Sequence, residues 1–191
     1  MCYSVLYNYV KEVDYISGAA IMIRSVLWKE IGGFDERFVP AYCEDSDLAF
    51  EVRKHGYKVM YQPLSVVVHF EGVSNGTDTS AGQKKYQIVN SEKFFEKWKD
   101  TLEKENFQNA QNVFVARDRS RKKKTVVVVD HYVPTFDKDA GSRTVYQYIK
   151  LFVENGFNVK LIGDNFYQSE PYTTAFQQMG VEVLYGSYYA S

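Results

Sequence analysis

The sequence predicts an α/β protein of two modules joined by a basic linker. Three observations predict it: strand and helix patterns alternate through residues 125–191, short apolar segments and amphipathic helices fill residues 1–115, and a charged block lies between them at residues 116–124. Strand–helix alternation is typical of parallel sheets, since parallel strands need crossover connections. The composition is 45% hydrophobic and 25% charged with a net charge of -1, so no electrostatic feature suggests nucleic acid as a partner.

The first module combines short helices, short strands and one long helix. Helical periodicity predicts a helix at Ser25–Ile31, which Gly32-Gly33 ends, and another at Asp47–His55. A long amphipathic helix is expected at Lys84–Lys104, with its aromatic residues on one face. Two further apolar runs, on either side of Pro63, are expected to be strands: Lys58–Gln62 and Leu64–Phe70.

The linker and the second module follow. Six of the nine residues 116–124 are basic, which favours a solvated linker over a nucleic-acid-binding arm. The continuous β-branched run Val126–Val129 predicts a strand buried on both faces. The pattern continues as the opening of a doubly wound parallel sheet, with a helix, a strand, a helix and a strand at Arg143–Glu154, Val159–Ile162, Tyr172–Met179 and Val181–Tyr185.

Three carboxylates crowd the start of a helix in the first module. Glu44, Asp45 and Asp47 lie within four residues. One interpretation is helix capping, because carboxylates accept hydrogen bonds from free N–H groups and suit the helix dipole. The other is general-base chemistry, because like charges raise one another's pKa and a raised pKa suits proton removal from a hydroxyl. The residues alone leave both open.

Four motifs around this cluster resemble a known family. Val-Asp-Tyr-Ile-Ser-Gly-Ala-Ala at 13–20, Gly-Gly-Phe-Asp-Glu-Arg-Phe at 32–38, Glu-Asp-Ser-Asp-Leu at 44–48 and then His69 resemble, in order and spacing, the C-terminal half of family 2 glycosyltransferases. The resemblance covers residues 10–105. It implies a partial GT-A domain that transfers a sugar, with inversion, from a nucleotide-sugar donor to a glycan or lipid-linked acceptor in surface polysaccharide synthesis.

The resemblance also implies site residues. Asp45 corresponds to the catalytic base, and Glu44, Asp47 and Gly18 would shape the acceptor pocket. His69 would be a ligand of a divalent metal, Mn²⁺ or Mg²⁺, whereas by itself a histidine at a strand end is more often a hydrogen-bonded structural residue. Ser74 and Asn75 could close over the nucleotide diphosphate, although a simple polar turn is an equal alternative.

The family's metal-binding Asp-x-Asp motif is expected before Val13, so this chain is expected to begin after that motif. The remainder of the polypeptide is therefore an expected partner, and this chain alone is expected to be inactive. The alternative from another class is a non-catalytic binding or scaffolding remnant.

Residues Val126–Asp164 resemble the start of another enzyme class, the Rossmann-like N-terminal half of family 4, GT-B-type glycosyltransferases. Gly141 and Ser142 open a predicted helix, where free backbone N–H groups suit a phosphate or an acceptor group. Alternatively, Asp139 and Ser142 are plain helix caps. A dinucleotide-binding G-x-G-x-x-G motif is missing from this segment.

Two cysteines without C-x-x-C spacing favour a reducing compartment over a disulfide framework or a zinc ribbon. The sequence contains neither a signal-peptide pattern at its start nor an apolar run near the ~20 residues that span a bilayer. The expected location is the cytoplasm, with peripheral attachment to the inner face of the membrane left open because many sugar acceptors are lipid-linked.

Overall fold

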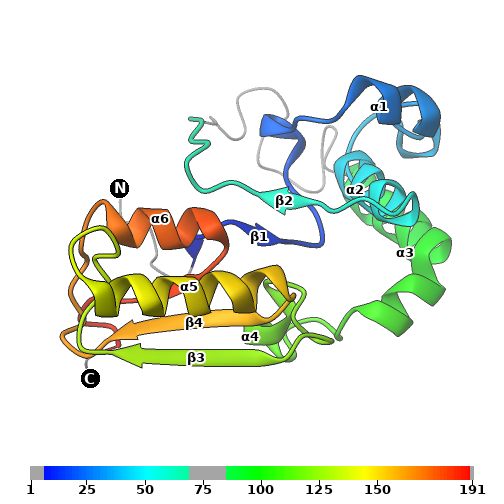
Figure 1. Ribbon diagram of the computed structural model, residues 1–191. Coiled ribbons are helices and arrows are strands. Elements are labelled where there is room, and N and C mark those ends of the chain that lie inside the picture. Colours follow the sequence, from blue (N-terminus) through cyan, green and yellow to red (C-terminus); the bar gives the residue numbers. More distant parts are fainter. Residues whose placement is uncertain (1–6, 69–84, 190–191) are drawn as a thin grey trace. The chain divides into compact units, whose positions relative to one another are not determined.

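The computed structural model describes residues 7–68 and 85–189, which form two compact units (Figure 1). Unit 1 is drawn from Met1–Lys11, Tyr61–Ser65 and Ser120–Ser191, and unit 2 from Glu12–Met60 and Val66–Arg119. Among the described residues, no helix combines the length and the apolar character that crossing a bilayer requires. The predicted boundaries at 1–115, 116–124 and 125–191 stay predictions.

Unit 1 is a three-stranded parallel sheet with two helices. Its elements are β3 (Thr125–Asp130), α5 (Ala140–Glu154), β4 (Asn158–Gly163), α6 (Tyr172–Met179) and β5 (Glu182–Leu184). The strand order is β3-β4-β5, with Val128 opposite Leu161 and Leu161 opposite Val183. The predicted α/β class and the alternating strand–helix pattern are confirmed. Whether the unit is the start of a GT-B domain stays a prediction.

Both helices of unit 1 cover the same face of its sheet (Figure 1). Right-handed crossovers require this arrangement when parallel strands are added in sequence order. The core between helices and sheet contains eight buried residues: Val133, Ile149, Val159, Leu161, Tyr172, Phe176, Val181 and Val183.

The other face of β3 is open, and here the sequence prediction was wrong. Val127 and Val129 are 55% and 66% exposed, whereas Val126 and Val128 are half-buried. A valine run is buried on both faces only when helices cover both faces of the sheet. The two helices of unit 1, α5 and α6, lie on one face, so the burial of β3 alternates.

Unit 2 is mainly helical. It contains α1 (Ser25–Ile31), α2 (Glu44–Lys54), the long α3 (Lys85–Glu105), α4 (Val113–Ala116) and two short 3-10 helices, η2 (Gly18–Ala20) and η3 (Glu36–Phe38). The bounds predicted for α1 are confirmed, and those of α3 differ by one residue at each end. Gly32 adopts φ 89° and ends α1, as expected for a helix-ending glycine.

The strands predicted on either side of Pro63 are largely missing. Only β2 (Met60–Tyr61) forms, paired with β1 (Lys11–Glu12), and residues 64–68 contain no strand. The last two residues of the second predicted strand lie outside the described residues. An extended segment becomes a strand only where a partner pairs with its backbone, and an apolar pattern does not supply that partner.

The core of unit 2 joins α2 to α3. Leu48, Ala49 and Phe50 of α2 are 1–4% exposed. The Phe50 ring packs edge-on against Phe94 of α3, with the centroids 5.0 Å apart, and lies 5.3 Å from Trp98. Edge-to-face aromatic contacts of this kind add to the energy of apolar burial, so α3 is the surface that fixes the position of α2.

Part of the basic block belongs to the packed structure of unit 2. Arg119 forms ion pairs with Glu12, Asp14 and Glu105, and its side chain is 17% exposed. Its pKa is raised, because its pairing with Asp14 and Glu105 outweighs the larger single effect of burial, which lowers it. The prediction of a solvated block was wrong for this residue, because three carboxylates distant in sequence surround it.

Candidate functional site

The acidic cluster forms the first turn of α2. Tyr42 and Cys43 adopt left-handed conformations, with φ of 76° and 71°, and they turn the chain into the helix. The helix therefore begins at Glu44, three residues before the predicted start, and all three acids lie in its first turn. Negative charge is favourable there because it offsets the helix dipole.

Asp45 is held against a second backbone segment. Its Oδ2 accepts a hydrogen bond of 3.0 Å from the Gly18 N–H at the start of η2, and its Oδ1 accepts one of 2.7 Å from the Ser46 N–H. A Cβ added at Gly18 would lie 3.4 Å from the Asp45 Cβ, so a small residue keeps the approach open. The structure thus brings together two of the predicted site residues, with Asp45 still partly exposed.

Glu44 has a shielded carboxylate oxygen. Its Oε2 is buried and contacts no hydrogen-bond donor among the described residues. Buried carboxylate oxygens normally have a partner, because an unpaired one loses its hydration without compensation. This oxygen is enclosed by the protein, so it lowers the stability of the helix start and is not a contact site for a ligand.

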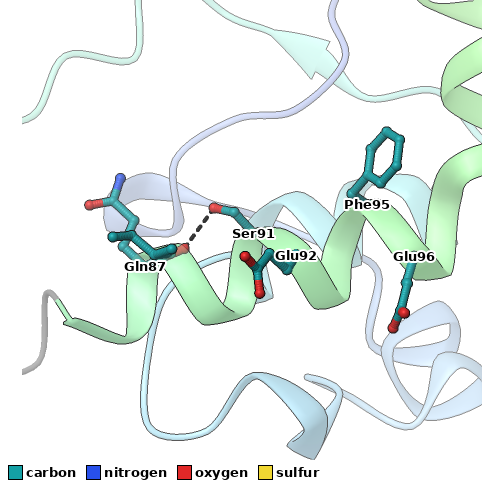
Figure 2. Close-up of a pocket in the computed structure, with 6 residues that line it drawn as sticks. Gln87, Ser91, Glu92, Phe95 and Glu96 are labelled. Atoms are coloured by element: carbon teal, nitrogen blue, oxygen red, sulfur yellow. Dashed lines mark hydrogen bonds between the residues drawn. The ribbon is translucent and has the colours of Figure 1, made fainter.

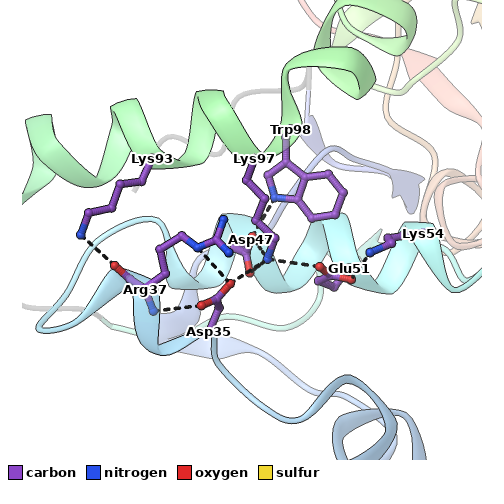
Figure 3. Close-up of polar contacts among 8 residues, drawn as sticks. All are labelled: Asp35, Arg37, Asp47, Glu51, Lys54, Lys93, Lys97 and Trp98. Carbon is purple, nitrogen blue, oxygen red and sulfur yellow. Dashed lines mark hydrogen bonds and ion pairs between the residues drawn. The ribbon is translucent and has the colours of Figure 1, made fainter.

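Asp47 points toward α3, where it contacts Lys97 and Trp98 (Figure 3). It is 2% exposed and accepts hydrogen bonds from the Trp98 Nε1 at 2.7 Å and from the Lys97 Nζ. An acceptor cannot reach a carboxylate enclosed in this way. The geometry gives Asp47 the role of fastening α2 to α3, and its predicted part in shaping the acceptor pocket stays a prediction.

Lys97 is a residue that the sequence analysis missed. Its Nζ lies 2.9 Å from Asp35, 2.8 Å from Asp47 and 3.1 Å from Glu51 (Figure 3). Burial lowers the pKa of Lys97, but the hydrogen bonds to Asp47 and Asp35 outweigh it, so the pKa is raised. This cation offsets the charge of Asp47 and leaves Asp45, on the other side of the helix, without a described ion pair.

A shallow hollow of about 700 Å³ lies along the exposed side of α3. Gln87, Ser91 and Phe95 are among its lining residues (Figure 2). The Ser91 Oγ donates to the Gln87 carbonyl at 2.6 Å and lies 3.8 Å from the Cys43 Sγ. The hollow therefore borders the segment that leads into the acidic cluster.

A second cavity of about 270 Å³ lies beside α2 and has mainly aliphatic walls that include Leu48 and Val52. Neither Glu44 nor Asp45 lines it, so it is separate from the candidate base.

The predicted metal and diphosphate residues, His69, Ser74 and Asn75, lie outside the described residues. Within residues 7–68 and 85–189, no group of three or more His, Cys, Asp or Glu side chains is placed to hold a metal ion. The described residues therefore do not by themselves form the divalent metal site that the resemblance implies, and Asp47 already pairs with Lys97.

At the start of α5, the geometry favours the capping alternative. The Asp139 Oδ1 accepts a 2.7 Å hydrogen bond from the Ser142 N–H, and Ser142 is 5% exposed. The hydrogen bond from the Ser142 N–H also holds the pKa of Asp139 below its ordinary value. A phosphate at Gly141 and Ser142 would have to displace this carboxylate, and the predicted phosphate or acceptor loop stays a prediction.

Comparison with known proteins gives the class of the chain as glycosyltransferase-like over part of its length. Over 71 residues, 37% of this chain, it is 34% identical to the N-acetylglucosaminyl-diphospho-decaprenol L-rhamnosyltransferase of Mycobacterium tuberculosis, covering 23% of that protein. Over 57 residues, 30% of this chain, it is 37% identical to the pre-mycofactocin glycosyltransferase of the same organism, covering 12% of that protein.

The matched region thus spans less than a quarter of the length of these curated relatives. No family profile and no solved structure matches the chain. The two relatives support a glycosyltransferase-like region, and the finer assignment to family 2 with a GT-B module stays a prediction.

Proposed function

We propose that unit 2 forms the acceptor side of an inverting glycosyltransferase and that Asp45 is its catalytic base. The observation that carries the proposal is the fixed, partly exposed Asp45 carboxylate, held by the Gly18 and Ser46 N–H groups. The similarity of part of the chain to glycosyltransferases supports it. A general base needs a fixed position within reach of the proton that it removes. The Ser46 N–H and hydroxyl bind Oδ1 and the Gly18 N–H binds Oδ2, so Oδ2 keeps a lone pair for a further donor.

The proposed reaction is a single displacement at the anomeric carbon of a nucleotide sugar. The acceptor hydroxyl oxygen attacks that carbon while Asp45 takes the hydroxyl proton. The new glycosidic C–O bond forms as the bond to the nucleotide diphosphate breaks, and the diphosphate leaves with the electron pair. Attack from the side opposite to the leaving group inverts the configuration. The orientation of the reactants by unit 2 would contribute much of the rate.

The acceptor is proposed to be a glycan or a lipid-linked sugar. Glu44 and Gly18, which lie beside Asp45, are proposed to shape its pocket. The first relative's name specifies a lipid-linked diphospho-sugar as that protein's substrate. A divalent metal, Mn²⁺ or Mg²⁺, held in part by His69 would supply positive charge to the departing diphosphate.

The test is the Asp45→Asn substitution in the full-length protein, with transfer measured from a panel of nucleotide sugars. Loss of the base is expected to lower kcat by about 10²–10⁴-fold. Asp100→Asn is the matched control, because Asp100 is an exposed aspartate on α3 and its substitution should leave kcat within about twofold. Turnover of Asp45→Asn close to wild type would remove the base assignment. Absence of both turnover and nucleotide-diphosphate binding in the wild type would favour a non-catalytic remnant.

A further inference from the structure

Asn90 is a fully buried polar residue in the middle of α3. Its exposed fraction is 0%, and the two N–H groups of its Nδ2 are shared among three backbone carbonyls: Phe38 at 2.8 Å, Ala41 at 2.7 Å and Tyr42 at 3.2 Å. All three belong to one loop, which lies 48–52 residues away in the sequence. A single amide group therefore gathers the carbonyls of the segment that leads into α2.

The contacts fix the orientation of this amide. Carbonyl oxygens only accept hydrogen bonds, so the NH₂ end of Asn90 must face the loop. The Oδ1 at the other end is buried and contacts no donor among the described residues. An apolar side chain would avoid that cost, but it would also leave the loop carbonyls unpaired. The position therefore matches one function, which is to hold this loop.

The held loop determines where α2 begins. Tyr42, the last residue that Asn90 contacts, and Cys43 after it both adopt left-handed conformations, and the helix starts at the next residue. No side chain caps this end, because Cys43 forms no capping hydrogen bond. The Cys43 carbonyl accepts the Asp47 N–H at 2.8 Å and starts the helical ladder. Any shift of the loop therefore moves the turn that carries Asp45.

A second attachment lies further along α3. Lys97 and Trp98 are seven and eight residues after Asn90, which is two helical turns and the same face of the helix. They bind Asp47 (Figure 3). The same face of α3 thus forms hydrogen bonds with the chain both before and after Asp45. The Lys97 attachment involves a side chain, whereas Asn90 holds the backbone itself.

From this geometry we propose that Asn90 is a positioning residue for the catalytic base. It touches neither acceptor nor donor, and it acts by fixing the Phe38–Tyr42 loop so that Asp45 meets Gly18 and the acceptor hydroxyl at the required distance. The proposal rests on the proposed function of Asp45. Misplacement of a catalytic group by about 1 Å can cost roughly 10²-fold in rate, so the effect should appear in kcat.

The experiment is a double-mutant cycle in the full-length protein, with Asn90→Ala, Asp45→Asn and the double variant. Asn90→Ala is expected to lower kcat about 10–100-fold and to leave the acceptor KM within about threefold, since the contact sites stay. In the Asp45→Asn background the same change should alter kcat by less than about threefold, because residues that act through one group are not additive. Lys93→Met is the control: it removes one solvent-open bond of 2.8 Å, from Lys93 of α3 to the Arg37 carbonyl, and should change kcat less than about twofold.

Thermal unfolding of each variant shows whether it is folded. If Asn90→Ala does not fold, Asn90→Ser, which keeps one hydrogen-bond donor, is used in its place. If Asn90→Ala lowers kcat by the same factor in the wild type and in Asp45→Asn, the positioning role is overturned. Unfolding of both Asn90 variants would also overturn it, because either result gives Asn90 a structural role only. Normal kcat in Asn90→Ala beside an inactive Asp45→Asn would reject this inference and keep the proposed function. Normal kcat in Asp45→Asn would reject the proposed function itself.

Discussion

Removal of the Asp47 carboxylate tests whether α2 is fastened to α3 as the structure shows. The substitution Asp47→Ala deletes the acceptor of the Trp98 indole N–H, which lies in a side chain that is 6% exposed. A buried donor left without an acceptor costs about 1–3 kcal/mol. Lys97 keeps Asp35 and Glu51 as partners, so the cost stays below the roughly 3–5 kcal/mol of an orphaned buried charge. We expect a loss of about 3 kcal/mol, and about half of that for Asp47→Asn, which keeps an acceptor oxygen.

The assay is urea unfolding followed by tryptophan fluorescence. Both tryptophans, Trp28 and Trp98, belong to unit 2, so the signal reports on this unit alone. Asp100→Ala on the exposed side of α3 is the control and should change the free energy of unfolding by less than about 0.5 kcal/mol. A loss for Asp47→Ala no larger than that of the control would refute the argument that this carboxylate joins the two helices.

Two further predictions concern pH and metal. Burial raises the pKa of Asp35, but hydrogen bonds from the Arg37 N–H and from Lys97 outweigh it and hold the pKa below the ordinary 3.8. The stability that this lowered pKa contributes is present above pH 3.8 and is lost as the pH falls through the lower pKa of the folded state. The urea concentration at half-unfolding of unit 2, followed by fluorescence, should therefore decrease once the pH is below about 4. The decrease should be less steep in Asp35→Asn. For the metal, calorimetry should show Mn²⁺ affinity at least about tenfold weaker in His69→Ala, whereas His131→Ala should bind as wild type; equal affinity in all three proteins would exclude His69 as a ligand.

The sequence could predict the elements whose pattern is local. The helix α1 is delimited by its own apolar spacing and by Gly32, and the strands and helices of unit 1 alternate at the predicted places because each carries a periodicity of its own. The burial of β3 could not be predicted from its own residues. The run Val126–Val129 is equally compatible with one or two covered faces, and only the position of α5 and α6 decides between them.

The site could be predicted in part for the same reason. The short motif at residues 44–47 indicated an acidic cluster, and the structure places Gly18 beside Asp45, whereas the roles of both residues in an acceptor site stay predictions. The contacts of Asn90 and Lys97 span 46–62 residues of sequence. An asparagine inside a helix is ordinarily exposed, and no local pattern distinguishes one that holds a distant loop.

Helix geometry nevertheless separates two of the three carboxylates once a single contact is known. Successive residues of an α-helix are rotated by about 100°, so residues 45 and 47 project in directions about 200° apart. Trp98 and Lys97 bind Asp47 and fix the side of α2 that faces α3. Asp45 must then project away from α3, toward η2, which is where its hydrogen bond to Gly18 lies. Asp47, the carboxylate that pairs with Lys97, supports the helix, whereas Asp45, which the same rotation turns away from that cation, is the one proposed to accept a proton.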